Sequence, residues 1–268
     1  MGEQKAIENS RRLTTRDSLA ADLRALGVDR GMTLLLHSSL STLGWVCGGA
    51  QAVIEAVMDV LGPSGNLVVP AQSGGLSDPA NWKAPPVPQA WWQTIRDTMP
   101  AYDPARTPTR NMGAIPELFR TWPGTMRSAH PADSFAASGP NAPAIIEPHA
   151  LDDPFGEGTP LSRLYDMGAS VLLAGVSYDR CTALHLAERR AAPDAPVDDS
   201  YAPVMVNGER RWTRYRMPAK NSDRFPAIGA WIETQGAVTH GTLGMAQSRL
   251  IAIRKLVDLG TEWLCQRA

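Results

Sequence analysis

The first 70 residues alternate between helical and strand patterns, and this alternation constrains the fold more than any other feature of the chain. Apolar residues recur at helical spacing over residues 16–26 and 50–61. Short apolar runs at 33–36 and 67–70 are typical of buried strands. A helix–strand–helix–strand order favours parallel strands, because a parallel connection needs a crossover element. We therefore expect an α/β fold with a mixed, largely parallel central sheet flanked by helices.

The rest of the chain predicts a long loop, a hairpin and a C-terminal helix. Residues 74–110 are rich in Pro, Trp and Asp, and a connection of this length usually forms a lid or a binding wall. Asn207-Gly208 indicates a β-hairpin over residues 201–217, preceded by a Pro/Asp-rich linker at 191–200. Residues 245–267 are predicted to form one helix. We expect residues 1–268 to form a single domain.

Composition excludes several classes of protein. The formal net charge of −1 supplies no basic field for nucleic acid or for an anionic membrane. The three cysteines are far apart and form no CxxC or Cys/His cluster, so we expect neither a disulfide framework nor a metal site. No apolar run has signal-peptide or membrane-spanning length. We expect a soluble protein of the reducing cytoplasm, acting as a monomer or a homodimer.

A histidine and a glutamate follow an apolar run that has the character of a buried strand, Val171 to Val176. Thr182 is a candidate N-cap for the next helix, which would place His185 at the third helical position and Glu188 three residues later. Residues at this spacing share one helix face. The carboxylate could then hold one ring nitrogen while the other faces a substrate, as in an oriented general base. On spacing alone, a surface His–Glu pair on a capped helix is the more common arrangement, so the general base depends on the context of these residues.

Other common catalytic patterns are absent from the sequence. There is no GxGxxG or GxxxxGK[ST] phosphate loop and no GxSxG nucleophile elbow. The HxxE pattern lacks the second histidine of metal motifs. These absences favour a base that activates a nucleophile belonging to the substrate.

Further candidate residues lie at the ends of predicted elements. His37, Ser38 and Ser39 end the first strand, at the edge where α/β sheets place ligands, although serine also caps helices routinely. Arg110 precedes Gly113 and a predicted helix, which suits a phosphate contact. His130 precedes a proline, which fits either a pocket wall or a buried structural histidine.

Taken together, three stretches in this order resemble the aminoglycoside N3-acetyltransferase family, closest to its bacillus-type members. The stretches are Leu36-His37-Ser38-Ser39-Leu40, Arg127-Ser128-Ala129-His130-Pro131 and Thr182-Ala183-Leu184-His185-Leu186-Ala187-Glu188. The resemblance covers nearly the whole chain and implies an α/β fold unrelated to GCN5-type acetyltransferases. It implies direct transfer of acetyl from acetyl-CoA to the 3-amino group of a 2-deoxystreptamine ring, hence antibiotic resistance, with no metal.

The resemblance also implies roles for particular residues. His185 would be the general base and Glu188 the carboxylate that orients it. The residues expected at the acetyl-CoA site are His37, Ser38, Ser39, Leu40, Thr109, Arg110, Met112 and Gly113. This chemistry is reasonable, because an alkyl ammonium must lose a proton before it can attack a thioester.

A polycationic acceptor also needs carboxylates around its amines. The candidates are Asp78 on the long loop and Asp152, Asp153 and Glu157 around the Pro154-Phe155-Gly156 turn. Two alternatives stay open at this point. The acceptor could be another small amine, or the chain could be a non-catalytic CoA-binding module, which would have no need of an oriented base.

Overall fold

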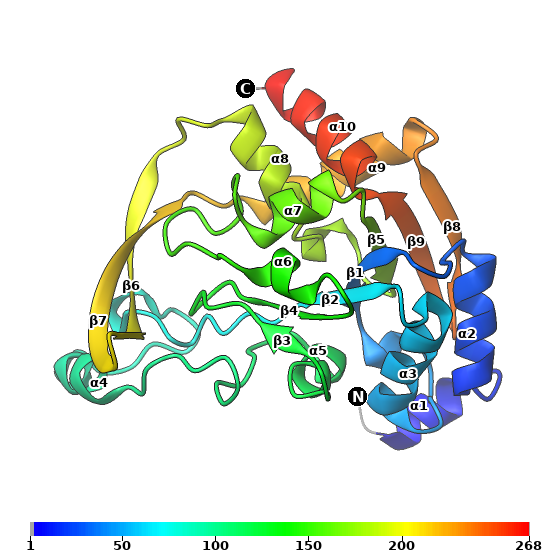
Figure 1. The fold of residues 1–268 in the computed structure, drawn as a ribbon, viewed down its shortest axis with the longest axis horizontal. Coiled ribbons are helices and arrows are strands. Elements are labelled where there is room, and N and C mark those ends of the chain that lie inside the picture. The colour runs from blue at the N-terminus through cyan, green and yellow to red at the C-terminus, as the bar shows by residue number, and fades with distance from the viewer. Residues whose placement is uncertain (1–2, 268) are drawn as a thin grey trace.

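The computed structural model describes residues 3–267, and in this part of the chain seven strands form one central sheet in the order β3-β4-β2-β1-β5-β9-β8 (Figure 1). Its strands are β1 (Thr33–Ser38), β2 (Asn66–Pro70), β3 (Met126–Arg127), β4 (Phe135–Ser138), β5 (Ser170–Ala174), β8 (Val238–Leu243) and β9 (Ala246–Ala252). β1 pairs in parallel with β2 and with β5, whereas the outer strands pair antiparallel. The expected mixed α/β fold is confirmed, with its parallel strands at the centre of the sheet.

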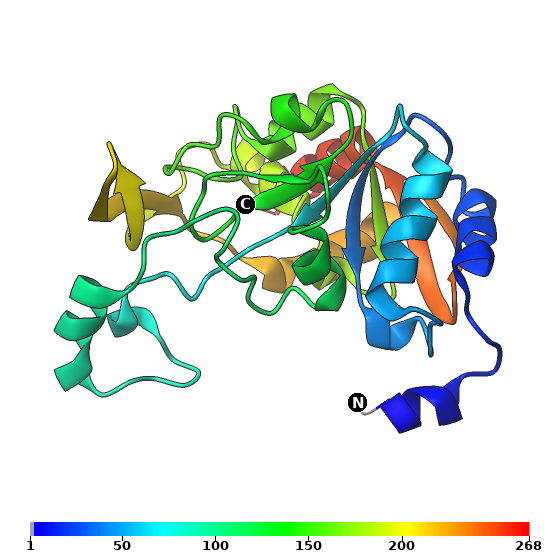
Figure 2. The ribbon, with the colours of Figure 1, turned by 60° about the horizontal axis from the view of Figure 1, so that its bottom comes forward.

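Helices cover both faces of this sheet (Figure 2). The α-helices are α1 (Glu3–Asn9), α2 (Arg16–Ala25), α3 (Gly49–Leu61), α4 (Trp92–Thr98), α5 (Ala114–Phe119), α6 (Ala142–Ile146), α7 (Pro160–Asp166), α8 (Leu184–Ala191), α9 (Phe225–Thr234) and α10 (Ile253–Cys265). None of the helices within residues 3–267 is long and apolar enough to cross a bilayer.

Successive side chains of the central strands enter two different cores, because side chains alternate between the faces of a sheet. Leu34 and Leu36 pack with α2, α3 and α5 on one face. Leu35 packs with α6 to α10 on the other face. Leu34, Leu35 and Leu36 are all fully buried, so the short apolar run of β1 contributes to both cores. This double burial explains why β1, β2 and β5 are apolar between their first residues, Thr33, Asn66 and Ser170, and their carboxyl ends.

Local sequence defines where several helices begin. Thr15 and Ser18 form a reciprocal capping box at the start of α2, and Thr159 and Ser162 form another at α7. α7 also carries Pro160 at its first position, where a missing N–H costs nothing. The helix predicted over residues 16–26 is therefore confirmed, with the hydrogen bonds that begin it.

A separate two-stranded hairpin, β6 (Val197–Val206) and β7 (Glu209–Pro218), extends from the body beside α4 (Figures 1 and 2). It is attached to the long loop over residues 74–110 by hydrogen bonds. The Tyr102 amide donates to Pro203 at 2.8 Å, and Arg210 Nε donates to the Met99 carbonyl at 2.6 Å. The hairpin predicted from Asn207-Gly208 is confirmed, and it supports the loop.

Two predictions about secondary structure are wrong. Residues 245–267 do not form one helix, because β9 occupies Ala246–Ala252 before α10 begins at Ile253. Pairing with β5 on one side and β8 on the other buries Leu250 and Ile251, and this long-range pairing outweighs the local helical spacing. The linker predicted at 191–200 is also too long, since β6 already begins at Val197.

Gly175, directly after β5, offers a test of how tightly the carboxyl edge of the sheet is packed. Its φ is +67°, and a Cβ there would lie 1.9 Å from Thr42 Oγ1. We expect Gly175→Ala to lower the free energy of unfolding by about 3 kcal/mol, from left-handed strain plus overpacking. Gly208 has φ +81° but open space around it, so Gly208→Ala should cost only about 1 kcal/mol. Urea denaturation of both variants checks this; equal losses would contradict the packing argument.

Candidate active site

The parallel pairing of β1 with β5 brings two polar segments together at the carboxyl edge of the sheet. Ser38 at the end of β1 lies opposite Ala174 at the end of β5. The Ser39 amide donates to the Ala174 carbonyl at 3.1 Å, which holds the two following loops side by side. The chain leaving β1 runs to α3 on one face of the sheet, whereas the chain leaving β5 runs to α8 on the other face, and ligands of open α/β sheets bind at such a point.

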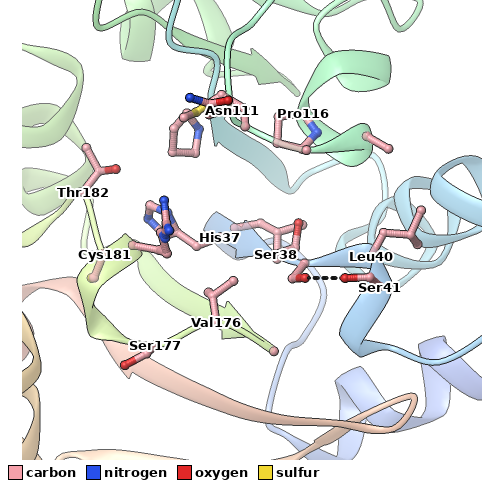
Figure 3. A pocket seen from close by; sticks show the side chains of 18 of the residues that line it. His37, Ser38, Leu40, Ser41, Asn111, Pro116, Val176, Ser177, Cys181 and Thr182 are labelled. Atoms are coloured by element: carbon pink, nitrogen blue, oxygen red, sulfur yellow. Dashed lines mark hydrogen bonds between the residues drawn. The ribbon is translucent and has the colours of Figure 1, made fainter. Parts of the chain in front are cut away.

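A cleft of about 1380 Å³ opens at this edge (Figure 3). It exceeds the usual size of a site for one small ligand and has room for two substrates. Six of the eight residues predicted for acetyl-CoA line it: His37, Ser38, Ser39, Leu40, Met112 and Gly113. His185 lines it as well.

The remaining two predicted residues stand apart from this lining. Both the backbone amide and the hydroxyl of Thr109 donate to Glu117 Oε2, each at 2.7 Å, which fixes the start of α5. Arg110 is exposed and its guanidinium lies against Gly75 of the long loop. Their contact with acetyl-CoA stays a prediction.

His185 and Glu188 form the predicted pair on α8. Nδ1 of His185 lies 2.7 Å from Glu188 Oε2, and each side chain is 14% exposed. A carboxylate only accepts hydrogen bonds, so Nδ1 carries the proton of the neutral ring and Nε2 keeps its lone pair. The other carboxylate oxygen, Oε1, accepts from the Asn221 amide at 3.1 Å. Glu188 is therefore held from two sides while it orients His185.

The helix that carries this pair begins later than predicted. α8 starts at Leu184, so Thr182 is not its N-cap and His185 lies at the second helical position. Instead, the Thr182 carbonyl accepts from the His185 amide at 3.0 Å, and Thr182 lines the cleft. The preceding turn, Tyr178–Arg180, displaces the helix start. The i, i+3 geometry of His185 and Glu188 is unaffected.

His37 is a buried neutral base in the wall of the cleft. Burial, and secondarily the nearby His185, lower the pKa of His37 to about 3. Its Nε2 and the hydroxyl of Ser38 have no hydrogen-bond partner among the residues that the structure describes, although both atoms are buried. Buried polar atoms without partners are uncommon and costly, so these two are available for a bound substrate.

His130 is a structural histidine. It is fully buried; its Nδ1 accepts from the Asp133 amide at 2.9 Å and its Nε2 lies 3.1 Å from the Leu151 carbonyl. It is not among the residues that line the cleft. The motif that contains it therefore supports the wall and does not form it.

Each of the four carboxylates predicted to bind the acceptor is paired with an arginine. Asp78 bonds Arg96 at 2.8 Å, Asp152 bonds Arg216 at 3.3 Å, Asp153 bonds Arg189 at 3.0 Å, and Glu157 bonds Arg190 at 2.8 Å. None of them is in the lining of the large cleft. Their role in acceptor binding stays a prediction, and in this structure they fasten loops to neighbouring elements.

Sequence reasoning missed a further part of the cleft wall. Val176, Ser177, Cys181 and Thr182 follow β5, and Ser222 and Phe225 follow the hairpin. The first group could have been found from its position after a predicted central strand. The second group reaches the cleft only because the hairpin returns the chain to α8, and no local pattern indicates that.

Comparison with known proteins identifies relatives over nearly the whole chain. Residues 35–265 match the family model described as aminoglycoside 3-N-acetyltransferase. The chain is 42% identical to the SPbeta prophage-derived aminoglycoside N(3')-acetyltransferase-like protein YokD of Bacillus subtilis, over 97% of this chain and 96% of that protein. It is 37% identical to aminoglycoside N(3)-acetyltransferase VII of Streptomyces paromomycinus, over 98% and 96%.

Solved structures agree with the sequence comparison. The crystal structure of YokD superimposes with a TM-score of 0.96 at 42% identity, over 98% of this chain and 97% of that one. AAC-IIIb in a binary complex with CoASH gives a TM-score of 0.85 at 32% identity, over 96% and 98%. AAC-VIa bound to sisomicin gives 0.84 at 31% identity, over 96% and 99%.

The buried histidines predict how stability depends on pH. The pKa values of His37 and His149 are both lowered to about 3, chiefly by burial, so below pH 6.5 the unfolded chain binds more protons than the folded chain. Each histidine should then remove about 1.4 kcal/mol of unfolding free energy per pH unit as the pH falls toward 4. Urea denaturation from pH 7 to 5 measures this slope.

A variant of His37, compared with a variant of a surface histidine, isolates the contribution of His37 to the pH dependence of stability. His37→Asn should have a shallower slope, by about 1.4 kcal/mol per pH unit. His240 is exposed, and His240→Asn controls for loss of a surface histidine. A His37→Asn slope equal to that of the unmodified protein would contradict a neutral, buried His37.

Proposed function

This chain belongs to the aminoglycoside 3-N-acetyltransferase family. We propose that it transfers the acetyl group of acetyl-CoA directly to the 3-amino group of a 2-deoxystreptamine aminoglycoside. This activity confers antibiotic resistance. The observation that carries this proposal is the His185–Glu188 pair, bonded at 2.7 Å in the wall of a cleft large enough for two substrates. Acetyl-CoA use is supported by the CoASH complex of the relative AAC-IIIb, and the acceptor class by the sisomicin complex of AAC-VIa.

The residues of the cleft fit an acyl-CoA cosubstrate. His37 Nε2 and Ser38 Oγ lack partners within the described part of the chain and can bond the polar groups of a pantetheine arm. Acetyl-CoA supplies the acetyl group as a thioester. Met112 and Gly113 line the same cleft from the start of α5. These residues form the proposed cofactor site together with Ser39 and Leu40.

His185 acts as the general base in this proposal. The acceptor amine is a nucleophile only after it loses a proton, and Nε2 of His185 has the free lone pair that takes it. Glu188 fixes the tautomer through Nδ1 and stabilises the imidazolium that forms. The amine then attacks the thioester carbonyl to form the C–N bond, the C–S bond breaks, and the leaving thiolate takes the proton from the His185 imidazolium. No acyl-enzyme is needed, because the substrate itself provides the nucleophile.

A second candidate acceptor, a small amine of lower charge, is favoured by one observation. The acids predicted to bind a polycation are paired with arginines. Among the described residues that line the cleft, Asp179 is the one carboxylate, and it pairs with Arg180 at 3.1 Å. A panel of aminoglycosides and simple amines distinguishes the two acceptor classes.

The free thiols at Cys47, Cys181 and Cys265 support a cytoplasmic location, where acetyl-CoA is made.

The base is tested by His185→Ala. We expect kcat to fall by about 10² to 10⁴-fold, because the acceptor keeps its proton, while acetyl-CoA binding stays largely intact. Thiol release from acetyl-CoA with gentamicin, kanamycin and apramycin measures turnover, and calorimetry measures cofactor binding. Near-normal turnover in this variant would remove His185 as the base. Saturable acetyl-CoA binding without turnover of any aminoglycoside by the unmodified protein would redirect the search to other amines.

The predicted phosphate contact is tested by Arg110→Ala. If Arg110 pairs with a phosphate of acetyl-CoA, the variant should raise KM for acetyl-CoA about tenfold and leave KM for the acceptor unchanged. Arg106, whose side chain is 89% exposed and pairs with Asp103, provides a matched control as Arg106→Ala. An unchanged cofactor KM in Arg110→Ala would count against the contact.

A further inference from the structure

The imidazole of His185 lies between two buried phenylalanine rings. Phe155 stacks on it almost face to face, with ring centroids 4.8 Å apart and planes 16° apart. Phe225 meets it at a steeper angle, 61°, also at 4.8 Å. Phe155 is 3% exposed and Phe225 is 1% exposed. His185 is thus in contact with aromatic carbon as well as with the carboxylate of Glu188.

The hydrogen bond to Glu188 does not by itself fix the plane of this ring. It holds Nδ1, but the imidazole can still tilt about the axis that passes through that bond. A tilt moves Nε2, the atom at the opposite edge that must meet the acceptor. A rigid ring stacked on the imidazole face restricts this tilt, whereas an edge-on contact such as that of Phe225 constrains it less.

The turn that carries Phe155 is anchored on every side. Asp153 bonds Arg189 of α8 through both carboxylate oxygens, at 3.0 and 3.1 Å. The Pro154 carbonyl lies 3.0 Å from His149 Nε2, and the Gly156 carbonyl accepts from Thr159 Oγ1 at 2.7 Å. Because Arg189 belongs to the same helix as His185, this ion pair connects the turn directly to the helix that carries the base.

A partly buried ion pair places a cation over the same ring. The ammonium of Lys220 lies 5.0 Å from the Phe155 ring centroid and 3.1 Å from Asp133, whose side chain is 7% exposed. The next residue, Asn221, donates its amide to Glu188. The Asp133–Lys220 pair therefore contacts the face of Phe155. It also positions the Asn221 amide, which donates to the carboxylate of Glu188.

We propose that Phe155 is a positioning residue, which fixes the plane of the His185 imidazole so that Nε2 faces the acceptor amine. This inference rests on the proposed role of His185 as the general base. Phe155 touches neither substrate in this scheme and acts only through the ring of His185. Three acid–arginine pairs around its turn, at Asp152, Asp153 and Glu157, hold it in place together with the Asp133–Lys220 pair.

The test compares Phe155→Leu with Phe155→Tyr. Leu keeps apolar bulk but loses the flat ring, and we expect kcat to fall about 10 to 100-fold with KM for acetyl-CoA changed by less than about twofold. Tyr keeps the ring and should restore most of kcat. A Phe155→Leu enzyme with unchanged kcat, or a Phe155→Tyr enzyme as impaired as Phe155→Leu, would overturn the proposal.

Phe135→Leu is the matched control for simple loss of packing. Phe135 is fully buried and contacts Phe155 edge-on at 6.4 Å, and no ring contact joins it to His185. We expect Phe135→Leu to lower the melting temperature at least as much as Phe155→Leu but to keep kcat at a temperature where all variants are folded. If Phe135→Leu loses as much kcat as Phe155→Leu, the loss in Phe155→Leu reflects general destabilisation and the proposal is contradicted.

A second readout does not depend on the acceptor. In the folded enzyme without substrates, NMR of ¹⁵N-labelled histidine reports the conformation of the His185 ring. We expect one sharp set of ring signals in the unmodified protein and in Phe155→Tyr, and exchange-broadened signals in Phe155→Leu. Sharp, unmoved signals in Phe155→Leu would contradict the proposal even if no amine in the panel is acetylated. Failure of the proposed function is seen separately, as absence of turnover by the unmodified protein.

Discussion

The parallel pairing of β1 with β5 is the constraint on which the rest of the site depends. It aligns the carboxyl end of one strand, with His37 and Ser38, with the end of another, after which the chain runs to His185. The two segments are far apart in sequence, and only the register of Ser38 opposite Ala174 makes them neighbours. The cleft, its unpartnered polar atoms and the start of α8 all follow from that pairing.

Two histidines in the same cleft have opposite surroundings. His185 has a carboxylate 2.7 Å from Nδ1, which leaves Nε2 with a free lone pair. His37 is buried without such a partner, and burial lowers its pKa to about 3. One imidazole is therefore equipped to accept a proton during a reaction, and the other stays neutral and serves as a fixed polar group.

Charge around the site is used mainly to hold loops in place. Asp153 fastens the Phe155 turn to α8, Asp78 closes the long loop through Arg96, and Asp152 joins the loop before α7 to β7. Partly exposed pairs of this kind contribute little to stability individually, but their geometry positions the backbone between them. Because the same arginines neutralise these acids, the acids offer less negative charge to a polycationic acceptor. The class of acceptor therefore depends on the electrostatics of the site.

The sequence by itself determined the α/β character of the fold, the hairpin at Asn207-Gly208 and the spacing of His185 and Glu188, because each depends on residues close together in the chain. It also predicted six residues that line the cleft, from their positions at the ends of elements and from the resemblance of the chain to a known family. Only the tertiary structure decided that residues 246–252 form a strand, since pairing with β5 and β8 stabilises it. Likewise, local sequence contains no signal that Phe155 and Phe225 enclose His185 or that arginines pair with the predicted acids. Those contacts join residues between 18 and 64 positions apart, and folding energy is gained from them only once the chain has closed the loops between them.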